Sequence, residues 1–486
     1  MHRFLISAAH KSSGKTTISI GLTAALKARG HGIQTFKKGP DYIDPLWLGL
    51  AAGRACRNLD FYLSSHDEIK AHFARHGALS NVCLIEGNKG LYDGLDLEGS
   101  NSNAALARLL DLPVILVLDA RGMTRGIAPL ILGYQAFDRE LNIAGVILNQ
   151  LGGSRHEAKL RAVIEHYTDV PVVGAVHADP RLKLAERHLG LMPANETSAA
   201  ARHITEIADL VASQVNLDRL LELTATQSAL VQALPARTTS VPPADTVRIA
   251  IARDAAFGFY YADDLDAFAA AGAELAPFDT LHDARLPVAD GLFIGGGFPE
   301  CFLDALEANT SLRSDIHAAI EAGLPTYVEC GGLMYLARSI AWQGNTRKMV
   351  GVIPGDIVMH DKPVGRGYVK LAPAAEHPWA GLSSDKPPAA DLSALIAAHE
   401  FHYSSVLNLP PQTRYAYRVQ RGYGIDGHND GIIYRNLLAS YTHLRSTPAY
   451  DWAARFVHFV QFVRSLSKHQ TQSSIKEIKP WSQPLA

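Results

Sequence analysis

The chain has 486 residues, of which 47% are hydrophobic and 19% are charged, and its formal net charge is −2 at pH 7. This length predicts two or three domains, and the nearly balanced charge argues against a nucleic-acid-binding protein. No apolar run in the sequence approaches the roughly 18 residues of a transmembrane helix, so we expect no membrane association.

The four cysteines lie far apart in the sequence, at Cys56, Cys83, Cys301 and Cys330. Because they show no paired spacing, they predict neither a zinc site nor a disulfide scaffold, and they fit a reducing compartment. The apolar patch near the N-terminus is too short for a signal peptide. We therefore expect a cytoplasmic protein.

A phosphate-binding loop follows the first predicted strand, residues 3–8, and precedes a helical pattern over residues 18–29. Its end reads Ser13-Gly14-Lys15-Thr16-Thr17, and these residues are the candidate ATP-binding residues. In such a loop, backbone N–H groups surround the phosphates, the lysine reaches the β- and γ-phosphate oxygens, and the first threonine, here Thr16, binds Mg²⁺. Ala9 stands where the usual pattern has its first glycine, and the alternative is a surface turn with an incidental lysine.

The second predicted strand, residues 33–36, leads into a charged loop that contains Lys38, Asp41, Tyr42 and Asp44. The carboxyl ends of parallel strands line the ligand crevice of an α/β sheet. We therefore expect Asp41 to assist the metal ion and Lys38 to face a phosphate or a carboxylate, with Lys38, Tyr42 and Asp44 as substrate-binding candidates. Taken alone, the same stretch would be a solvated charged loop.

A third strand is predicted over residues 82–85, and Glu86 follows it at the Walker-B position, where an acid binds Mg²⁺. The stretch 87–94 is rich in glycine, which lets the backbone approach a ligand closely. Tyr92 and Asp93 in this stretch are further substrate-binding candidates.

Two more strands are predicted over residues 113–118 and 143–148, and each ends in a polar residue. Asn149 follows the second of them, and an amide at that position suits adenine recognition because it both donates and accepts. Strands that alternate with helical patterns predict an α/β fold with a parallel sheet.

Residues 224–246 lose the apolar periodicity and are rich in Ala, Thr, Ser and Pro, so we interpret them as an interdomain linker. The predicted domains are an ATP-binding domain over residues 1–223 and a second domain over residues 247–465. The last residues, 466–486, are polar and are interpreted as a frayed tail.

A candidate nucleophile lies in the second domain, where Cys330-Gly331-Gly332 joins an apolar run at 324–328 to an apolar segment at 333–337. A thiol between a strand and a helix N-terminus is favoured as a thiolate, and the N–H of Gly331 would face an oxyanion formed beside the sulfur. The glycine run 295–297 could supply the second oxyanion donor. The alternative is a buried structural cysteine.

A thiol nucleophile needs a base, and two histidine-containing stretches follow it. One contains His399 and His402, and the other contains His443. Because the chain has 21 histidines, spacing alone does not choose between His402 and His443.

In this order, the motifs resemble those of the cobyrinic acid a,c-diamide synthase family over residues 3–465. The matching stretches include the phosphate-binding loop, the charged loop and the cysteine motif. In full they are Ser13-Gly14-Lys15-Thr16-Thr17, residues 38–45, Asn58-Leu59-Asp60, Glu86-Gly87 with residues 90–94, residues 257–261, Gly295-Gly296-Gly297, Cys330-Gly331-Gly332, residues 399–404, and Ser440-Tyr441 with His443.

The resemblance implies an amidotransferase with two α/β domains that takes ammonia from L-glutamine and uses ATP and Mg²⁺. Its N-terminal domain is similar to dethiobiotin synthetase, and its C-terminal domain is similar to class I glutaminases of the Cys-His type. By motif, Cys330 is the nucleophile, His443 is its base, and Gly297 and Gly331 are the oxyanion donors. Many class I glutaminases have an acid two residues after the histidine. Arg445 occupies that position here, so the sequence shows no third member.

The implied reaction is amidation of acetate side chains of a tetrapyrrole through an acyl phosphate, with cobyrinate as one candidate substrate. Sirohaem is the other, because Leu48 stands where family members often have a histidine, and Asn88-Lys89 stands where an apolar pair is more usual. Nickel-sirohydrochlorin is a weaker third option. Amidation of several propionates, as in cobyric acid synthase, is disfavoured by the residues of the 38–45 motif.

An alternative from another class is an ATP-driven switch protein whose C-terminal domain only binds a partner. The N-terminal half alone would support it, but Cys330 with its two glycines and His443 argue against it. The oligomeric state stays open, with a homodimer as one alternative.

Overall fold

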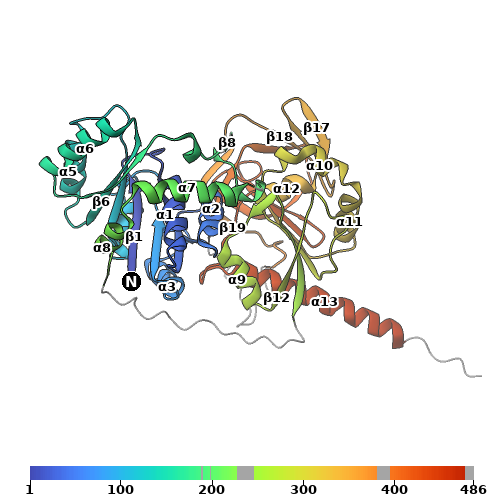
Figure 1. The fold of residues 1–486 in the computed structure, drawn as a ribbon. Coiled ribbons are helices and arrows are strands. Elements are labelled where there is room, and N and C mark those ends of the chain that lie inside the picture. The colour runs from blue at the N-terminus through green and yellow to red at the C-terminus, as the bar shows by residue number, and fades with distance from the viewer. Residues whose placement is uncertain (188–189, 198, 227–245, 380–394, 477–486) are drawn as a thin grey trace, which may run out of the picture. The chain divides into compact units, whose positions relative to one another are not determined.

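The computed structural model describes residues 1–187, 190–197, 199–226, 246–379 and 395–476 (Figure 1). The chain divides into two compact units, Met1–Ala236 and Arg237–Ala486. Most of the predicted linker, residues 227–245, lies outside the described residues. Just before those residues, the Thr226 amide donates to the Met1 carbonyl at 3.0 Å, so unit 1 continues past residue 223.

Unit 1 is built on a seven-stranded sheet in which every neighbouring pair is parallel. Most strand residues are buried on both faces, as expected for a parallel sheet covered by helices on each side. In spatial order the strands are β3 (Arg57–Leu59), β2 (Ile33–Lys38), β4 (Val82–Glu86), β1 (His2–Ala8), β5 (Val114–Asp119), β6 (Ile143–Leu151) and β7 (Val172–His177).

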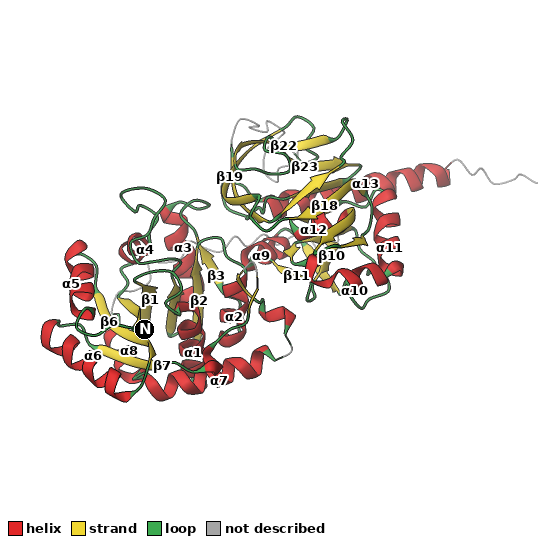
Figure 2. Cartoon of the chain, turned by 90° about the horizontal axis from the view of Figure 1, so that it is seen from above, coloured by secondary structure: helices red, strands yellow, loops and turns green. Residues whose placement is uncertain are grey.

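The helices of unit 1 form two layers, and each layer closes its own apolar core. Figure 2 shows α1 and α7 on one side of the strands and α3 and α4 on the other. The first layer contains α1 (Lys15–Ala28), α2 (Ile43–Ala52), α7 (Ala200–Gln214) and α8 (Leu217–Leu223). The second contains α3 (His66–Gly77), α4 (Asn103–Leu109), α5 (Ile127–Phe137) and α6 (Ser154–Tyr167).

Unit 2 is built on a mixed nine-stranded sheet. Strands β12, β10, β13, β15 and β24 are parallel, and the sheet continues with antiparallel pairs. In spatial order the strands are β12 (Ala273–Phe278), β10 (Val247–Ala252), β13 (Gly291–Ile294), β15 (Thr326–Glu329), β24 (Leu437–Ser440), β23 (Asn429–Tyr434), β22 (Arg414–Arg421), β19 (Gly365–Pro373) and β20 (Ile396–His402).

Smaller sheets and helices complete unit 2. A four-stranded sheet contains β17 (Asn345–Lys348), β16 (Ala337–Trp342), β18 (Ile353–Met359) and β21 (Ser404–Leu407), and a short ladder joins β11 (Phe257–Phe259) to β14 (Gly296–Gly297). The helices are α9 (Ala262–Ala270), α10 (Leu303–Ala308), α11 (Thr310–Glu321), α12 (Gly331–Leu336) and α13 (Trp452–Lys476).

The predicted fold class, a parallel P-loop sheet followed by a second α/β domain, is confirmed. Some local features differ from the predictions. The strands β3 and β7 were not predicted, and the three residues of β3 are too few to show a period. Helix α13 continues to Lys476, so the first part of the expected tail is helical. Among the helices in the described part of the chain, none has the length and apolar character needed to span a membrane.

Helix α1 carries the phosphate-binding loop at its N-terminus and packs closely against α7. A Cβ added at Gly21 would lie 2.5 Å from Cγ2 of Val211 and 3.1 Å from Cγ2 of Ile207. Gly133 on α5 offers a matched control, because a Cβ there would meet no heavy atom within 4 Å.

We predict that Gly21→Ala lowers the free energy of unfolding by about 1–3 kcal/mol, because the new methyl group displaces a stiff β-branched side chain. Gly133→Ala should be neutral or stabilising by about 0.4–1 kcal/mol. Denaturant titrations followed by circular dichroism measure both. Equal stability of the two variants would contradict close packing of α1 on α7.

Candidate active site

The phosphate-binding loop joins β1 to α1 through backbone conformations that few residues adopt. Ser12 has φ 66° and Gly14, which precedes α1, has φ 90°. The side-chain amide of Asn149 at the end of β6 donates to the Ser13 carbonyl at 2.9 Å, and a Cβ on Gly14 would lie 2.1 Å from that amide nitrogen. The loop therefore requires glycine at position 14, and the N–H groups that open α1 are available to an anion.

Asn149 was predicted to recognise adenine. In the structure Asn149 is buried, and its side-chain amide nitrogen donates to the Ser13 carbonyl. This hydrogen bond stabilises the conformation of the phosphate-binding loop. Adenine recognition by its oxygen remains a prediction.

A charged cluster lies next to this loop at the ends of β2 and β4. The Thr16 hydroxyl donates to Oε1 of Glu86 at 2.6 Å and lies 3.4 Å from Oδ2 of Asp44. The ammonium of Lys37 lies 2.5 Å from Asp44 Oδ2 and 3.0 Å from Glu86 Oε1. Because Lys37 is buried between two carboxylates, their charges raise its pKa despite the opposing effect of burial.

The donor set of this cluster fits Mg²⁺. Oε2 of Glu86 is buried and has no hydrogen-bond partner among the described residues, and burial raises the pKa of this carboxyl. Thr16, Glu86 and Asp44 offer hydroxyl and carboxylate oxygens, the ligands that Mg²⁺ prefers. Asp41, predicted to assist the metal, instead accepts from the amides of Ile43 and Asp44 at 2.9 and 3.2 Å, and its carboxylate is 3.9 Å from Lys37.

Two further lysines are buried near these strand ends. Burial lowers the pKa of Lys15 to about 8, against the opposing charge of Glu86, and it lowers the pKa of Lys38 to about 8 as well. Lys38 donates to Oδ1 of Asn88 at 3.0 Å. An anionic ligand beside either ammonium would raise its pKa again, as expected for a phosphate or carboxylate site.

The remaining predicted substrate residues take part in loop structure. The hydroxyl of Tyr92 donates to the Tyr134 carbonyl at 2.6 Å, and Asp93 accepts from the Gly90 amide at 2.8 Å. Tyr42 precedes α2 and is 9% exposed. Of the predicted substrate residues, the structure therefore brings Asp44 into the charged cluster, whereas Tyr92 contacts α5 and Asp93 contacts the backbone of its own loop.

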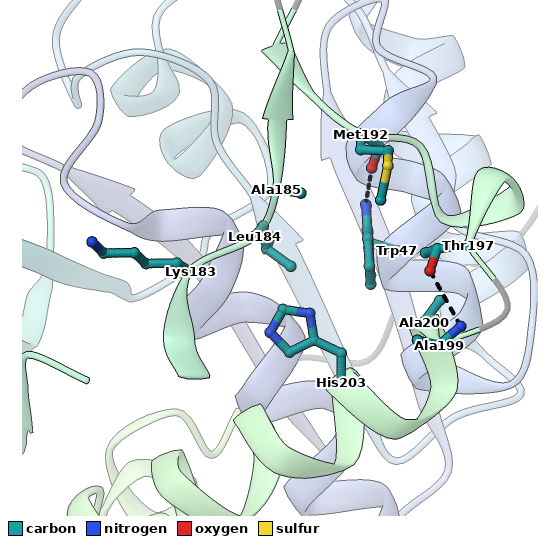
Figure 3. Close-up of a pocket in the computed structure, with 9 residues that line it drawn as sticks. All are labelled: Trp47, Lys183, Leu184, Ala185, Met192, Thr197, Ala199, Ala200 and His203. Carbon is teal, nitrogen blue, oxygen red and sulfur yellow. Dashed lines mark hydrogen bonds between the residues drawn. The ribbon is translucent and has the colours of Figure 1, made fainter. Parts of the chain in front are cut away.

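A cavity of about 380 Å³ lies beside α2, as Figure 3 shows. Trp47, which lines it, donates to the Met192 carbonyl at 2.9 Å and is one helical turn beyond Asp44. The side chain of Lys183 extends away from Trp47 in Figure 3. The lining is mainly apolar and consists of Trp47, Lys183, Leu184, Ala185, Met192, Thr197, Ala199, Ala200 and His203.

In unit 2, Cys330 occupies a sharp turn between β15 and α12. Its φ of 48° and ψ of −104° are unusual for a residue with a side chain, and its amide donates to the Ser440 carbonyl at 2.7 Å. Such a strained strand-to-helix turn is typical of enzyme nucleophiles, which it projects beside free helix N–H groups.

The two predicted oxyanion residues lie against each other. A Cβ added to Gly331 would be 3.0 Å from the Gly297 nitrogen, and one added to Gly297 would be 1.9 Å from the Ala256 carbonyl oxygen. On the other side, a Cβ on Gly296 would be 2.6 Å from Cε1 of His443. Glycine is therefore required where these chain segments meet beside the thiol.

His443 is the histidine that the structure places against Cys330. Its Nδ1 lies 3.3 Å from Oε2 of Glu329, which leaves Nε2 for the sulfur. Burial alone would lower the pKa of His443, but its hydrogen bonds with Cys330 and Glu329 and their charges raise it to about 10. A raised pKa favours the imidazolium form of His443 at neutral pH.

His399 packs on the ring of His443, with ring centres 5.0 Å apart and planes 18° apart. The two backbones also bond in both directions, at 2.8 and 3.3 Å. Burial holds the pKa of His399 well below its usual value, so its ring is neutral. The pair fixes the plane of the His443 imidazole.

His402, the other candidate base, takes part in a separate buried cluster. Its ring stacks on Tyr441 at 3.9 Å, and its Nδ1 lies 2.9 Å from the Ser404 carbonyl. Glu400 lies 3.7 Å from its Nε2 and accepts from the backbone amides of Tyr423 and Gly424. This environment is that of a structural histidine.

Comparison with known proteins adds to this geometry. Residues 5–191 match the family model of the CobQ/CobB/MinD/ParA nucleotide binding domain, and residues 248–449 match that of the CobB/CobQ-like glutamine amidotransferase domain. A protein of Magnetococcus marinus named cobyrinate a,c-diamide synthase is 44% identical over 461 residues, which cover 94% of this chain and 97% of the relative. The chain belongs to the cobyrinate a,c-diamide synthase family.

Other proteins of the same name are similar over nearly as much of the chain. That of Methanosarcina acetivorans is 40% identical and covers 94% of each chain. That of Listeria monocytogenes is 39% identical and covers 91% of this chain and 96% of the relative. The predicted resemblance to the cobyrinate a,c-diamide synthase family is thus confirmed, and the amidotransferase match argues against an ATP-driven switch protein.

Two residues of this family member's sites were missed by the sequence analysis. Lys37 lies beside the predicted Lys38, but strand residues alternate in direction, so Lys37 contacts the charged cluster and Lys38 contacts Asn88. Glu329 directly precedes Cys330. The sequence feature that could have identified it is an acidic residue at the end of a buried strand. The acid of many class I glutaminases follows the histidine instead, so Glu329 was not predicted.

The lowered pKa of Lys15 should make ATP binding depend on pH. Because this pKa is about 8 in the free protein and rises beside phosphate, we expect ATP binding at about pH 8.5 to take up protons and to weaken as pH rises further. Calorimetric titrations in two buffers with different ionisation enthalpies measure this uptake. Lys38→Gln should retain the uptake, and its loss in that variant would assign the effect to Lys38.

Proposed function

We propose that the protein is an ATP- and glutamine-dependent ligase that converts acetate side-chain carboxylates of a tetrapyrrole, foremost cobyrinate, into carboxamides. The observation that carries this proposal is the Cys330–His443 pair in an amidotransferase domain that follows a P-loop domain on one chain. Each domain supplies one of the two chemical requirements of amide synthesis: an ammonia source and carboxylate activation.

Activation is needed because a carboxylate is a poor electrophile and its oxygen is a poor leaving group. Transfer of the γ-phosphoryl group of ATP to the carboxylate gives an acyl phosphate, from which phosphate can leave. In this proposal Lys15 and the N–H groups of α1 bind the phosphates, with Ser13, Gly14, Thr16 and Thr17 forming the loop. Mg²⁺, held by Thr16, Glu86 and either Asp41 or Asp44, would add positive charge to the phosphates.

The charges of unit 1 support binding of a polycarboxylate. Lys38 is buried, and Asn88 orients its ammonium, so it is the proposed partner of a substrate carboxylate. Tyr42, Tyr92 and Asp93 remain proposed substrate neighbours through the loops they shape.

Ammonia is released in unit 2. The Cys330 thiolate forms a bond to the carboxamide carbon of glutamine, and the proposed N–H donors Gly297 and Gly331 stabilise the resulting oxyanion. The carbon–nitrogen bond breaks as His443 gives its proton to the leaving ammonia. Water then hydrolyses the glutamyl thioester to glutamate, and the ammonia displaces phosphate from the acyl phosphate of the tetrapyrrole.

Sirohaem remains the second candidate substrate, on the residues Leu48, Asn88 and Lys89. Asn88, which differs from the usual family pattern, contacts Lys38 and therefore lies beside the proposed carboxylate site. The free thiols of Cys56, Cys83, Cys301 and Cys330 support a cytoplasmic location. A homodimer stays a proposal.

Product masses test the proposed substrate. The protein is incubated with glutamine, ATP and Mg²⁺, and with cobyrinate or sirohaem in separate reactions. Each carboxyl converted to a carboxamide replaces OH by NH₂ and lowers the product mass. A shift on cobyrinate alone is the expected result, whereas a shift on sirohaem alone would make the protein a sirohaem amidase. No shift on either, with glutaminase activity intact, would refute both substrates.

The variant Cys330→Ala separates the two half-reactions. We predict that it loses glutamine-dependent amidation by at least about 10³-fold, because no nucleophile remains. Amidation with ammonium salts should continue at the wild-type rate, and Cys301→Ala should keep both activities. Failure of ammonium to rescue a correctly folded Cys330→Ala protein would contradict a role limited to ammonia supply.

A further inference from the structure

Glu329 is a buried carboxylate, 2% exposed, whose two oxygens both have partners beside the glutaminase site. Oε1 accepts from the Tyr327 hydroxyl at 2.7 Å and from the Leu444 amide at 2.9 Å. Oε2 faces Nδ1 of His443 at 3.3 Å. Two donors therefore fix one oxygen and aim the other at the imidazole.

Many class I glutaminases have an acid two residues after the histidine, but this chain has Arg445 at that position. Arg445 is 6% exposed, and its guanidinium donates to Asp263 at 2.7 Å and lies over the ring of Tyr261. A cation held in this way does not orient the N–H of an imidazole. Glu329 is the carboxylate that the structure places at Nδ1 instead.

We propose that Glu329 is the positioning residue that completes the Cys330–His443 pair, by holding the proton on Nδ1 and stabilising the imidazolium. This inference deepens the proposed function, on which it rests for the identity of the glutaminase. The acid is the last residue of β15 and the nucleophile follows it directly in the turn before α12.

The proton balance defines the role of each group. The thiol proton first passes to Nε2 of His443, which leaves a thiolate; the sulfur then bonds to the carboxamide carbon, and the same proton leaves with ammonia when the carbon–nitrogen bond breaks. Glu329 neither gains nor loses a proton. Its contribution is to keep Nδ1 protonated, so that Nε2 has a lone pair to accept the thiol proton.

The variant Glu329→Gln tests the proposal. Its amide oxygen can still accept from Tyr327 and Leu444, but its NH₂ group would face Nδ1 and favour the tautomer with the proton on Nε2. We expect kcat for glutamine hydrolysis to fall by about 10²–10⁴-fold, with little change in KM. Alkylation of Cys330 by iodoacetamide at neutral pH, followed by peptide mass spectrometry, should slow as well.

Two further variants provide controls. Tyr327→Phe removes one donor to Oε1 and should reduce kcat by about tenfold, since one hydrogen bond to a charged group is lost. Glu321→Gln changes a partly exposed carboxylate of the same unit that contacts Tyr434 and Arg435, and it should retain wild-type glutaminase activity.

The outcomes separate this proposal from the proposed function. Glutamine hydrolysis and alkylation need no tetrapyrrole, so an error about the substrate leaves this test valid. A Glu329→Gln protein that melts like the wild type and keeps its kcat would overturn the role of Glu329. So would equal losses of glutamine-dependent and ammonium-dependent amidation, because they would indicate structural damage.

Discussion

Buried charge that must be paired is the constraint on which both sites depend. In unit 1, Lys37 lies between Asp44 and Glu86 at the ends of parallel strands, and in unit 2, Glu329 lies between His443 and Tyr327. Removing charges from water costs several kcal/mol per ion, and a salt bridge repays that cost only with good geometry. A chain selected for stability alone would fill these positions with apolar side chains, so their charges indicate function.

The sheet architecture brings these charges together. Glu86 ends β4, and Lys37 lies in β2, its parallel neighbour, with the two residues in register. Glu329 ends β15 opposite Ser440 of β24, three residues before His443. In each unit, residues distant in sequence meet because the carboxyl ends of adjacent parallel strands share one edge. The helices provide the rest of the environment: α1 brings Thr16, and α12 begins directly after Cys330.

Much of this could be predicted from local patterns. The strand before Ser13, the glycine at position 14 and the thiol at 330 are each features of a few consecutive residues, which a sequence displays directly. Partnerships across the sheet could not be predicted in the same way. The contacts of Asn149 with Ser13, of Asp44 with Thr16 and of Glu329 with His443 depend on register and side-chain direction, which only the folded structure fixes.

The placement of Glu329 and Cys330 at the end of one strand has a consequence for folding. Glu329 ends β15 and Cys330 follows it directly, while His443 lies three residues after the end of β24, the strand that is hydrogen-bonded to β15. A slip of one residue between these strands would move every side chain of β24 to the opposite face and separate the imidazole from both its partners. Partly folded forms of unit 2, and forms with a shifted strand register, would therefore not hydrolyse glutamine. Glutamate release would then report the fraction of molecules with the native strand register, a quantity that spectroscopic measures of secondary structure do not resolve.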